Sequence, residues 1–78
     1  MAEGAMKPFD PVPGKVYRRC SGGEYICVTP VHIPYPAGEA RLRNIKTGWT
    51  FRAMGVVQYE NGTIDWDYYR GGYLDVPQ

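Results

Sequence analysis

The chain has 78 residues, a formal net charge of +1, seven prolines and ten glycines. A chain this short forms one domain with a small core, because it buries only about 60% of its unfolded surface. The charge argues against bulk attraction to nucleic acid or anionic membranes, and no apolar run approaches the ~20 residues that span a bilayer. The N-terminus has no apolar signal segment, so we expect a cytoplasmic protein.

The N-terminal segment differs in composition from the rest of the chain. Residues 1–13 contain three prolines and show no apolar periodicity, which predicts a flexible arm. Met6 is an alternative natural start within it. Residues 14–78 are predicted to form a single β-barrel domain.

A first hairpin is predicted around a glycine pair. Residues 15–20 and 24–29 read as strands, with Gly22-Gly23 at the centre of the turn. The core face of this hairpin carries Tyr17, Ile26 and Val28. Arg19 shares that face, which indicates a bulge or a different turn length.

The two cysteines, Cys20 and Cys27, fall in this hairpin as diagonal neighbours, about 7–8 Å apart. That separation exceeds the range typical of a disulfide, so we expect two free thiols. A zinc site needs two further ligands, and His32 is the one histidine of the chain. No metal and no cofactor are expected.

A proline-rich loop follows over residues 30–38, because proline offers no N–H to a strand ladder. Its apolar side chains are predicted to form a lid on the core, with an exposed contact surface as the alternative; they are Val31, Ile33 and Tyr35. Residues 39–45 form the third strand. Lys46-Thr47-Gly48 reads as a three-residue hairpin loop with glycine in the left-handed position.

The strongest local signal is Asn61-Gly62, which predicts a hairpin with a two-residue type I′ turn. The core face of this hairpin carries Val57, Tyr59, Ile64, Trp66 and Tyr68. In this register Val57 faces Trp66, and Asp65 and Asp67 lie on the opposite face. The first strand of the pair begins at Trp49, and Gly55 in its middle predicts a bulge.

Even strand spacing and glycine turns predict an all-β fold, a small five-stranded antiparallel SH3-like barrel. An OB-type barrel fits less well, because it usually includes a helix. Residues 73–76 form a short closing strand or a single 3₁₀ turn.

Catalytic chemistry has little support. Asp65 and Asp67 are paired carboxylates of the kind that serve as acid and base, yet they fit the solvated face of a hairpin, where charge discourages aggregation. No cysteine, serine or acidic residue lies at a spacing that would put it beside His32 as a catalytic partner. Residues 21–23 lead into a strand rather than into a helix that could bind phosphate. We therefore expect no enzyme activity.

Four basic residues fall in one hairpin and suggest phosphate contact: Arg41, Arg43, Lys46 and Arg52. The predicted register puts Arg41 and Arg43 on one side of the sheet and Arg52 on the other. Single-stranded nucleic-acid binding through arginine and stacked aromatic rings is therefore the alternative function, not the first one.

The chain carries more aromatic residues than so small a barrel can bury. Tyr68 and Tyr69 are adjacent, so they point to opposite faces of a strand and one of them is exposed. Tyrosine and arginine are enriched in protein contact surfaces. A protein-binding site is predicted near the end of the chain, at Tyr35, Tyr68, Tyr69, Arg70 and Tyr73.

The segment GWTFRAMGVVQYENGTIDWDYYRGGY carries a Gly-Trp, then Asn-Gly-Thr-Ile, then Trp-Asp and Gly-Gly. It resembles small proteins of bacterial and phage genomes to which no function is attached. The resemblance covers about a third of the chain and implies a bacterial or mobile-element origin.

These observations favour a small non-catalytic binding module for a protein partner, a bacterial or phage accessory protein. The alternatives are single-stranded nucleic-acid binding and a structural or inhibitory role.

Overall fold

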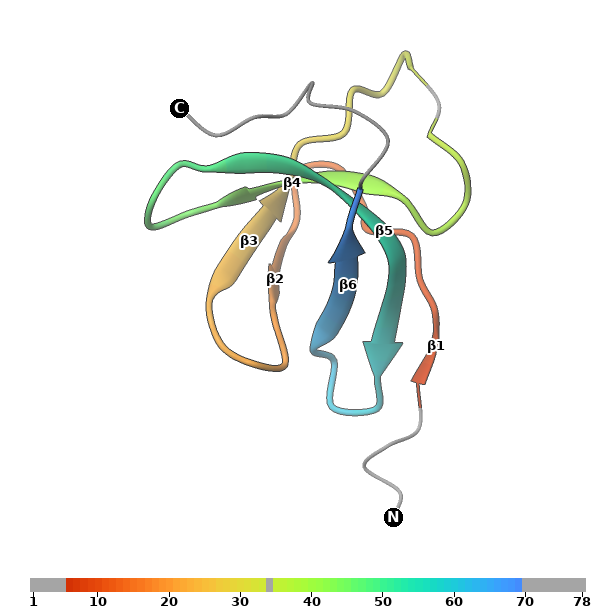
Figure 1. The fold of residues 1–78 in the computed structure, drawn as a ribbon, viewed down its shortest axis with the longest axis vertical. Helices are drawn as coiled ribbons and strands as arrows, with labels where there is room; N and C mark the ends of the chain where they lie inside the picture. The colour runs from red at the N-terminus through yellow and green to blue at the C-terminus, as the bar shows by residue number, and fades with distance from the viewer. Residues whose placement is uncertain (1–5, 34, 70–78) are drawn as a thin grey trace.

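The computed structural model describes residues 6–33 and 35–69, and this part of the chain contains strands and no helix (Figure 1). The strands are β1 (Met6–Pro8), β2 (Val16–Arg18), β3 (Glu24–Cys27), β4 (Ala40–Asn44), β5 (Thr50–Tyr59) and β6 (Ile64–Tyr68). All the strand pairs are antiparallel. The prediction of an all-β fold with a small, curled antiparallel barrel is confirmed.

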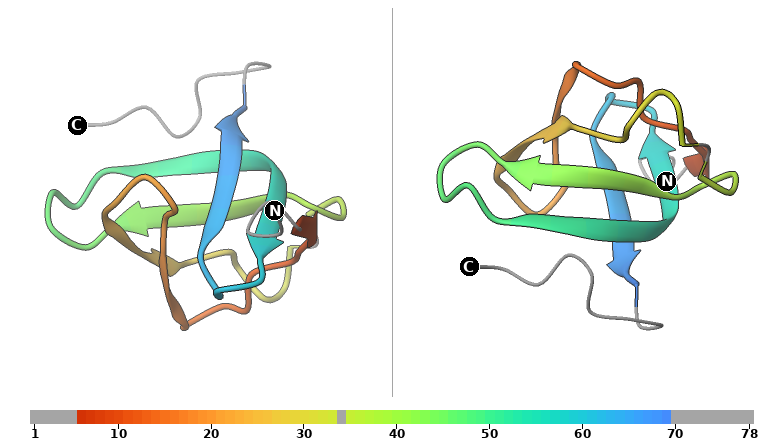
Figure 2. Two further views of the ribbon diagram at one scale, coloured as in Figure 1. Left: turned by 90° about the horizontal axis from the view of Figure 1, so that it is seen from below. Right: turned by 90° about the horizontal axis from the view of Figure 1, so that it is seen from above.

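The long strand β5 organises the sheet. Along one edge it pairs first with β4 and then with β1, and along the other edge it pairs with β6. From β4 the sheet continues through β3 to β2, and β6 crosses the β4–β5 pair at a steep angle (Figure 2). The sheet curls until Cys20 N–H donates to the carbonyl of Ile64 at 2.9 Å. The result is a half-barrel that closes between the β2–β3 turn and β6.

The predicted bulge at Gly55 is confirmed. Gly55 has φ +62° in the left-handed region, where glycine carries no steric penalty. The β5–β6 register shifts between Met54 and Val57, so Gly55 and Val56 together oppose Trp66. The extra residue reverses the alternation, which buries Val56 and leaves Val57 half-buried. The predicted pairing of Val57 with Trp66 is therefore wrong.

The turn at Asn61-Gly62 is a hairpin turn, as predicted, but it is longer. Tyr59 N–H donates to the carbonyl of Thr63, and Gly62 N–H donates to the carbonyl of Tyr59. Gly62 has φ +91°, and Asn61 does not have the positive φ that a type I′ turn requires. This is a three-residue loop with glycine at the left-handed position. It moves the register by one residue, so that Gln58 rather than Tyr59 faces Ile64.

The first hairpin uses the same three-residue geometry: Arg19 N–H donates to Gly23 O, and Gly22 N–H donates to Arg19 O. The predicted turn centre is therefore wrong. The correct register pairs Val16 with Ile26 and Tyr17 with Tyr25.

This register changes which side chains of β3 reach the core. Tyr25 and Cys27 are buried, whereas Ile26 and Val28, expected in the core, are half-buried. The thiols are free, as expected, but they are not neighbours, because Cys20 is exposed in the turn and Cys27 lies in the core.

The β4–β5 loop also exceeds its predicted length by one residue. Gly48 N–H donates to Asn44 O, and Asn44 N–H donates to Trp49 O, which makes a four-residue loop over 45–48. Gly48 occupies the left-handed position, as predicted, with φ +80°. In the resulting register Arg41 faces Arg52.

The core is built from the concave side of the curled sheet. Its buried residues are Tyr25, Cys27, Ala40, Leu42, Phe51, Ala53, Val56, Ile64 and Trp66. Trp66, expected in the core, is 5% exposed. Its ring makes edge-to-face contact with Tyr25 at a centroid distance of 4.9 Å. Such aromatic pairs add about 0.5–1.5 kcal/mol beyond area burial.

The described part of the predicted N-terminal arm lies against the barrel. Met6–Pro8 pairs with the end of β5. Phe9 N–H donates to Val56 O at 3.0 Å, and the Phe9 ring packs edge-on against Tyr17. Residues 6–9 thus extend the sheet.

Candidate binding surfaces on two faces of the barrel

Tyr68, the last residue of β6, and Tyr69, which follows it, point to opposite faces of the sheet, as their adjacency predicts. Tyr69 lies on the outer face beside Arg52, together with Tyr35. Tyr68 stacks on Trp49 on the concave side. The predicted contact residues therefore divide between two surfaces, and Arg70 and Tyr73 lie outside the described residues.

The first surface, which we name the tyrosine–arginine cluster, consists of Tyr35, Glu39, Arg52 and Tyr69. The Arg52 guanidinium lies 4.6 Å from the Tyr35 ring centroid and 4.3 Å from that of Tyr69. Arg52 Nε and Nη2 both donate to Glu39 Oε1, at 3.0 and 2.7 Å. The hydrogen bond to Glu39 raises the pKa of Arg52. The arginine is therefore held rigidly, with its charge neutralised, between two aromatic rings.

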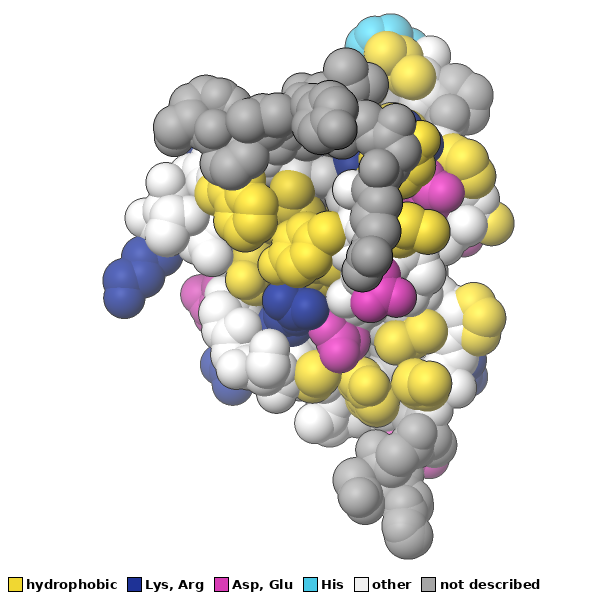
Figure 3. Space-filling model, viewed as in Figure 1, with side chains coloured by type: hydrophobic (Ala, Val, Ile, Leu, Met, Phe, Trp, Pro, Cys, Tyr) yellow, Lys and Arg dark blue, Asp and Glu magenta, His cyan; other side chains and the backbone are white. Residues whose placement is uncertain are grey.

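The loop that leads into this cluster exposes apolar side chains. Val31 is 84% exposed and Ile33 is 49% exposed. Ile33 N–H donates to Pro30 O, which bends the loop at its tip. Apolar and histidine side chains gather at the top of the molecule in Figure 3. The prediction that Val31 and Ile33 form a lid on the core is wrong; Tyr35, from the same loop, is half-buried over Arg52.

The basic residues are arranged differently from the prediction. Because Arg41 faces Arg52 and Arg43 faces Thr50, all three arginines lie on the outer face of the sheet. Their expected separation onto two sides followed from the wrong loop length. Arg43 is exposed, as is Lys46 in the adjoining loop, whereas Arg41 is half-buried and Arg52 is paired with Glu39.

The second surface, which we name the aromatic seam, lies between β6 and the β2–β3 hairpin and consists of Arg19, Trp49, Phe51, Trp66 and Tyr68. Trp49 and Tyr68 stack at 5.6 Å with an interplanar angle of 21°, and Phe51 lies 5.0 Å from each. Tyr68 is 36% exposed. Figure 3 shows an apolar patch with basic and acidic side chains below it, beside the outer edge of β6.

Arg19 closes one end of the aromatic seam. Its guanidinium lies 4.3 Å from the Trp66 ring centroid. Nε donates to Asp65 Oδ1 at 2.8 Å, Nη1 donates to Tyr68 Oη at 3.1 Å, and Nη2 donates to Trp66 O at 3.3 Å. The sequence places Arg19 on the core face of the first hairpin, where a charged side chain fits poorly. The structure accommodates it there through the ion pair with Asp65 and stacking on the Trp66 ring.

The electrostatics around Asp65 follow from these bonds. Burial by itself would raise the pKa of Asp65, but the hydrogen bonds from Arg19 and from Trp66 N–H outweigh it, so that the pKa is lowered. Burial raises the pKa of the nearby Cys20 thiol, and the hydrogen bond to Asp65 adds to that shift.

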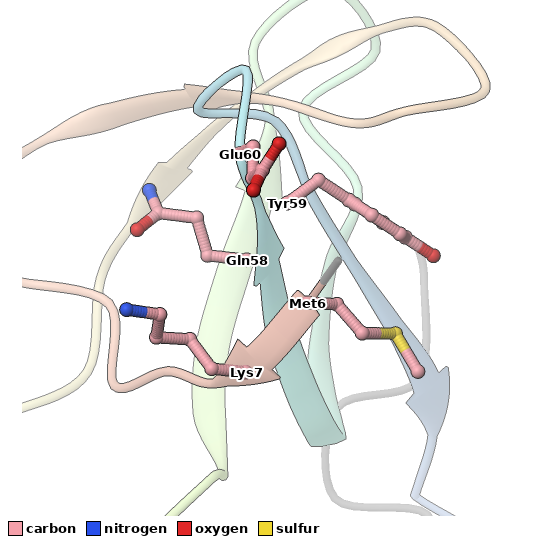
Figure 4. Close-up of a pocket in the computed structure, with 5 residues that line it drawn as sticks. All are labelled: Met6, Lys7, Gln58, Tyr59 and Glu60. Carbon is pink, nitrogen blue, oxygen red and sulfur yellow. The ribbon is translucent and has the colours of Figure 1, made fainter. Parts of the chain in front are cut away.

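No metal-binding cluster of three or more His, Cys, Asp or Glu side chains occurs within residues 6–33 and 35–69. A surface depression of about 380 Å³ lies at the end of β1 and β5 and is lined by Met6, Lys7, Gln58, Tyr59 and Glu60. Met6 and Tyr59 point to one side of the strand pair, and Lys7 and Gln58 point to the other (Figure 4). These polar groups do not converge on a ligand position.

Sequence reasoning proposed Tyr35, Tyr68 and Tyr69 as contact residues but did not point to Glu39 and Arg19, the residues that lie beside them in these two surfaces. A weak signal existed for Arg19, because a charged residue at a core position calls for a buried partner. No local signal pointed to Glu39.

Comparisons with protein-family models, with curated proteins and with solved structures found no match. Among the described residues, no helix is long and apolar enough to cross a membrane.

Proposed function

We propose that the protein is a small non-catalytic binding module that holds a protein partner against its outer face. The contact surface comprises the tyrosine–arginine cluster and the loop tip at Val31 and Ile33. The observation that carries the proposal is Arg52, clamped by Glu39 and placed between Tyr35 and Tyr69.

Preorganisation is the physical argument for this surface. Binding costs the entropy of every side chain that becomes ordered at the interface, about 0.5–1.5 kcal/mol for a flexible one. Arg52 is already ordered by two hydrogen bonds to Glu39. Tyrosine and arginine are also the residue types that dominate contact energies.

The exposed loop tip supports the same surface. Val31 keeps 84% of its surface in water, and Ile33 keeps about half. Burying such a side chain against a partner contributes about 1.5–3 kcal/mol. The resemblance of the chain to bacterial and phage proteins favours an accessory module of the bacterial cytoplasm; a structural or inhibitory accessory protein is the alternative.

Site-specific photo-cross-linking in the source cell tests this proposal. A photoreactive phenylalanine analogue is placed at Val31 or Ile33, and, as a matched control, at Asn61. All three positions are exposed, and the β5–β6 turn lies at the opposite end of the molecule from the loop (Figure 1). The proposal predicts one discrete protein adduct from positions 31 and 33 and none from position 61. Absence of an adduct at both loop positions, or the same adduct from Asn61, would overturn it.

Single-stranded nucleic-acid binding is a second candidate, favoured by the register that puts Arg41, Arg43 and Arg52 on one face. Under this alternative, affinity for an oligothymidylate falls steeply with salt, with a slope of about −0.7 for each phosphate neutralised. Arg43→Ala, which removes an exposed charge, would reduce the magnitude of that slope by about 0.7, the contribution of one phosphate contact. No change in fluorescence anisotropy at low salt would rule out this candidate.

A further inference from the structure

The outer edge of β6 is satisfied by side chains rather than by a neighbouring strand. Ile64 O accepts from Cys20 N–H, where the barrel closes. Beyond that point Trp66 N–H donates to Asp65 Oδ1, and Trp66 O accepts from Arg19 Nη2. The side chains of Arg19 and Asp65 therefore cap the backbone groups that a paired strand would otherwise occupy.

Two residues further along, at Tyr68, the cap ends. Tyr69 N–H donates to Arg52 O across the β5–β6 pair, so alternation directs the N–H and C=O of Tyr68 away from β5. Within residues 6–33 and 35–69 no hydrogen bond reaches these two groups. Among the described residues they form a short open edge of the kind on which added strands pair.

The aromatic rings beside this edge also have donors without acceptors. Trp49 Nε1 and Trp66 Nε1 are buried, and neither has a hydrogen-bond partner among the described residues. A buried N–H without a partner costs about 1–3 kcal/mol and calls for an acceptor from elsewhere. Both indoles belong to the aromatic seam, in which Tyr68 stacks on Trp49.

We propose that the aromatic seam accepts an extended, uncharged segment of a partner polypeptide as an added strand beside Tyr68. The backbone of the segment pairs with Tyr68 N–H and C=O, and one apolar side chain lies on the Trp49–Tyr68 stack. An uncharged segment fits because Arg19 is already neutralised by Asp65 at 2.8 Å. Main-chain pairing supplies affinity in this mode, and the side-chain pocket supplies selectivity. This surface is separate from the outer face, so it adds to the proposed function and does not depend on it.

The test uses two synthetic peptides and the ¹⁵N-labelled full chain. The first is an eight-residue peptide of alternating threonine and valine with one central phenylalanine. The second has the same sequence with alternate backbone nitrogens methylated, which removes the pairing N–H groups and keeps the side chains. The proposal predicts shifts at the Tyr68 amide and the Trp49 indole N–H, and at least tenfold slower exchange of the Tyr68 amide in the first complex.

The methylated peptide is expected to bind at least tenfold more weakly than its parent. Trp49→Phe, which keeps a ring but removes the indole N–H, should weaken the first complex severalfold. Tyr69→Ala changes the opposite face and should leave the affinity for the first peptide unchanged. The result for the aromatic seam can therefore be separated from the result for the outer-face proposal. No shift at Tyr68 with millimolar peptide, or equal binding of both peptides, would overturn the inference.

Discussion

The Arg19 side chain links the β2–β3 hairpin to β6, and Arg19→Met tests how much that link contributes to stability. Methionine preserves the apolar stem that covers Trp66 and removes the guanidinium. The variant loses hydrogen bonds to Asp65, Tyr68 and the carbonyl of Trp66, together with stacking on the Trp66 ring.

The expected loss is about 2–3 kcal/mol. Exposed ion pairs contribute about 0.2–1 kcal/mol and well-buried hydrogen bonds to a charged group about 1.5–3 kcal/mol. The Arg19 and Asp65 side chains are 20% and 33% exposed, which places their interaction between these limits. Stacking of the cation on the ring adds about 0.5–1 kcal/mol. Against a total stability of about 5–15 kcal/mol, this loss is readily measured.

Urea unfolding followed by tryptophan fluorescence measures the effect. The control is Arg18→Met, because Arg18 is the exposed residue just before Arg19, at the end of β2, and its change should stay within about 0.5 kcal/mol. If Arg19→Met is as stable as Arg18→Met, the account of the seam is wrong.

The pH dependence offers a second readout of the same pair. The folded-state pKa of Asp65 is lowered, so its contribution is present above the unfolded value of about 3.9 and is lost as the pH falls through the folded value. The difference in stability between wild type and Asp65→Asn should therefore shrink in acid below about pH 3.9. A difference that stays constant down to pH 2 would contradict this.

Substitutions at two further positions test the fold. Trp66→Ala should cost about 3–5 kcal/mol, because it removes a core ring that is 5% exposed, and a urea midpoint near that of wild type would show that Trp66 is not a core residue. Gly55→Ala should cost about 1–2 kcal/mol, since Gly55 has φ +62° and an added Cβ meets nothing within 4 Å, so the loss is conformational. Gly55→Asn should cost less than Gly55→Ala, and the reverse order in thermal unfolding would refute the bulge geometry.

The fold was predictable because alternation within a strand does not depend on its partner. Ile64, Trp66 and Tyr68 share one face of β6 whatever strand lies beside them, and that face does reach the core. The bulge was predictable because Gly55 lies in the middle of a long strand, where glycine marks a bend or bulge. These signals are local, and they were sufficient for an antiparallel barrel.

Register was not predictable, because glycine at the left-handed position serves loops of different length. Gly62 and Gly22 each end a three-residue loop, although the same sequence is also compatible with a two-residue turn. Each error moved pairings by one or more residues. At the β4–β5 loop it also misplaced Arg52 relative to Arg41.

The outer-face cluster was predictable only in part. Tyr35 comes from a loop, Arg52 from β5, and Tyr69 directly follows β6; the curl of the sheet brings them together. Because Tyr68 and Tyr69 are adjacent, the sequence predicts that their side chains point to opposite faces of the sheet. No local spacing shows which of the two rings contacts Arg52. The clamp by Glu39 depends on the same curl.

The central claim is that Tyr69 contacts a partner and does not merely cover the barrel. Its most direct test is the affinity of the partner found by cross-linking, measured by calorimetry for wild type and for Tyr69→Ala, with urea unfolding of both proteins. The account predicts at least a tenfold loss of affinity, about 1.4 kcal/mol, while the free energy of unfolding changes by less than about 1 kcal/mol. Unchanged affinity together with a marked loss of stability would contradict it.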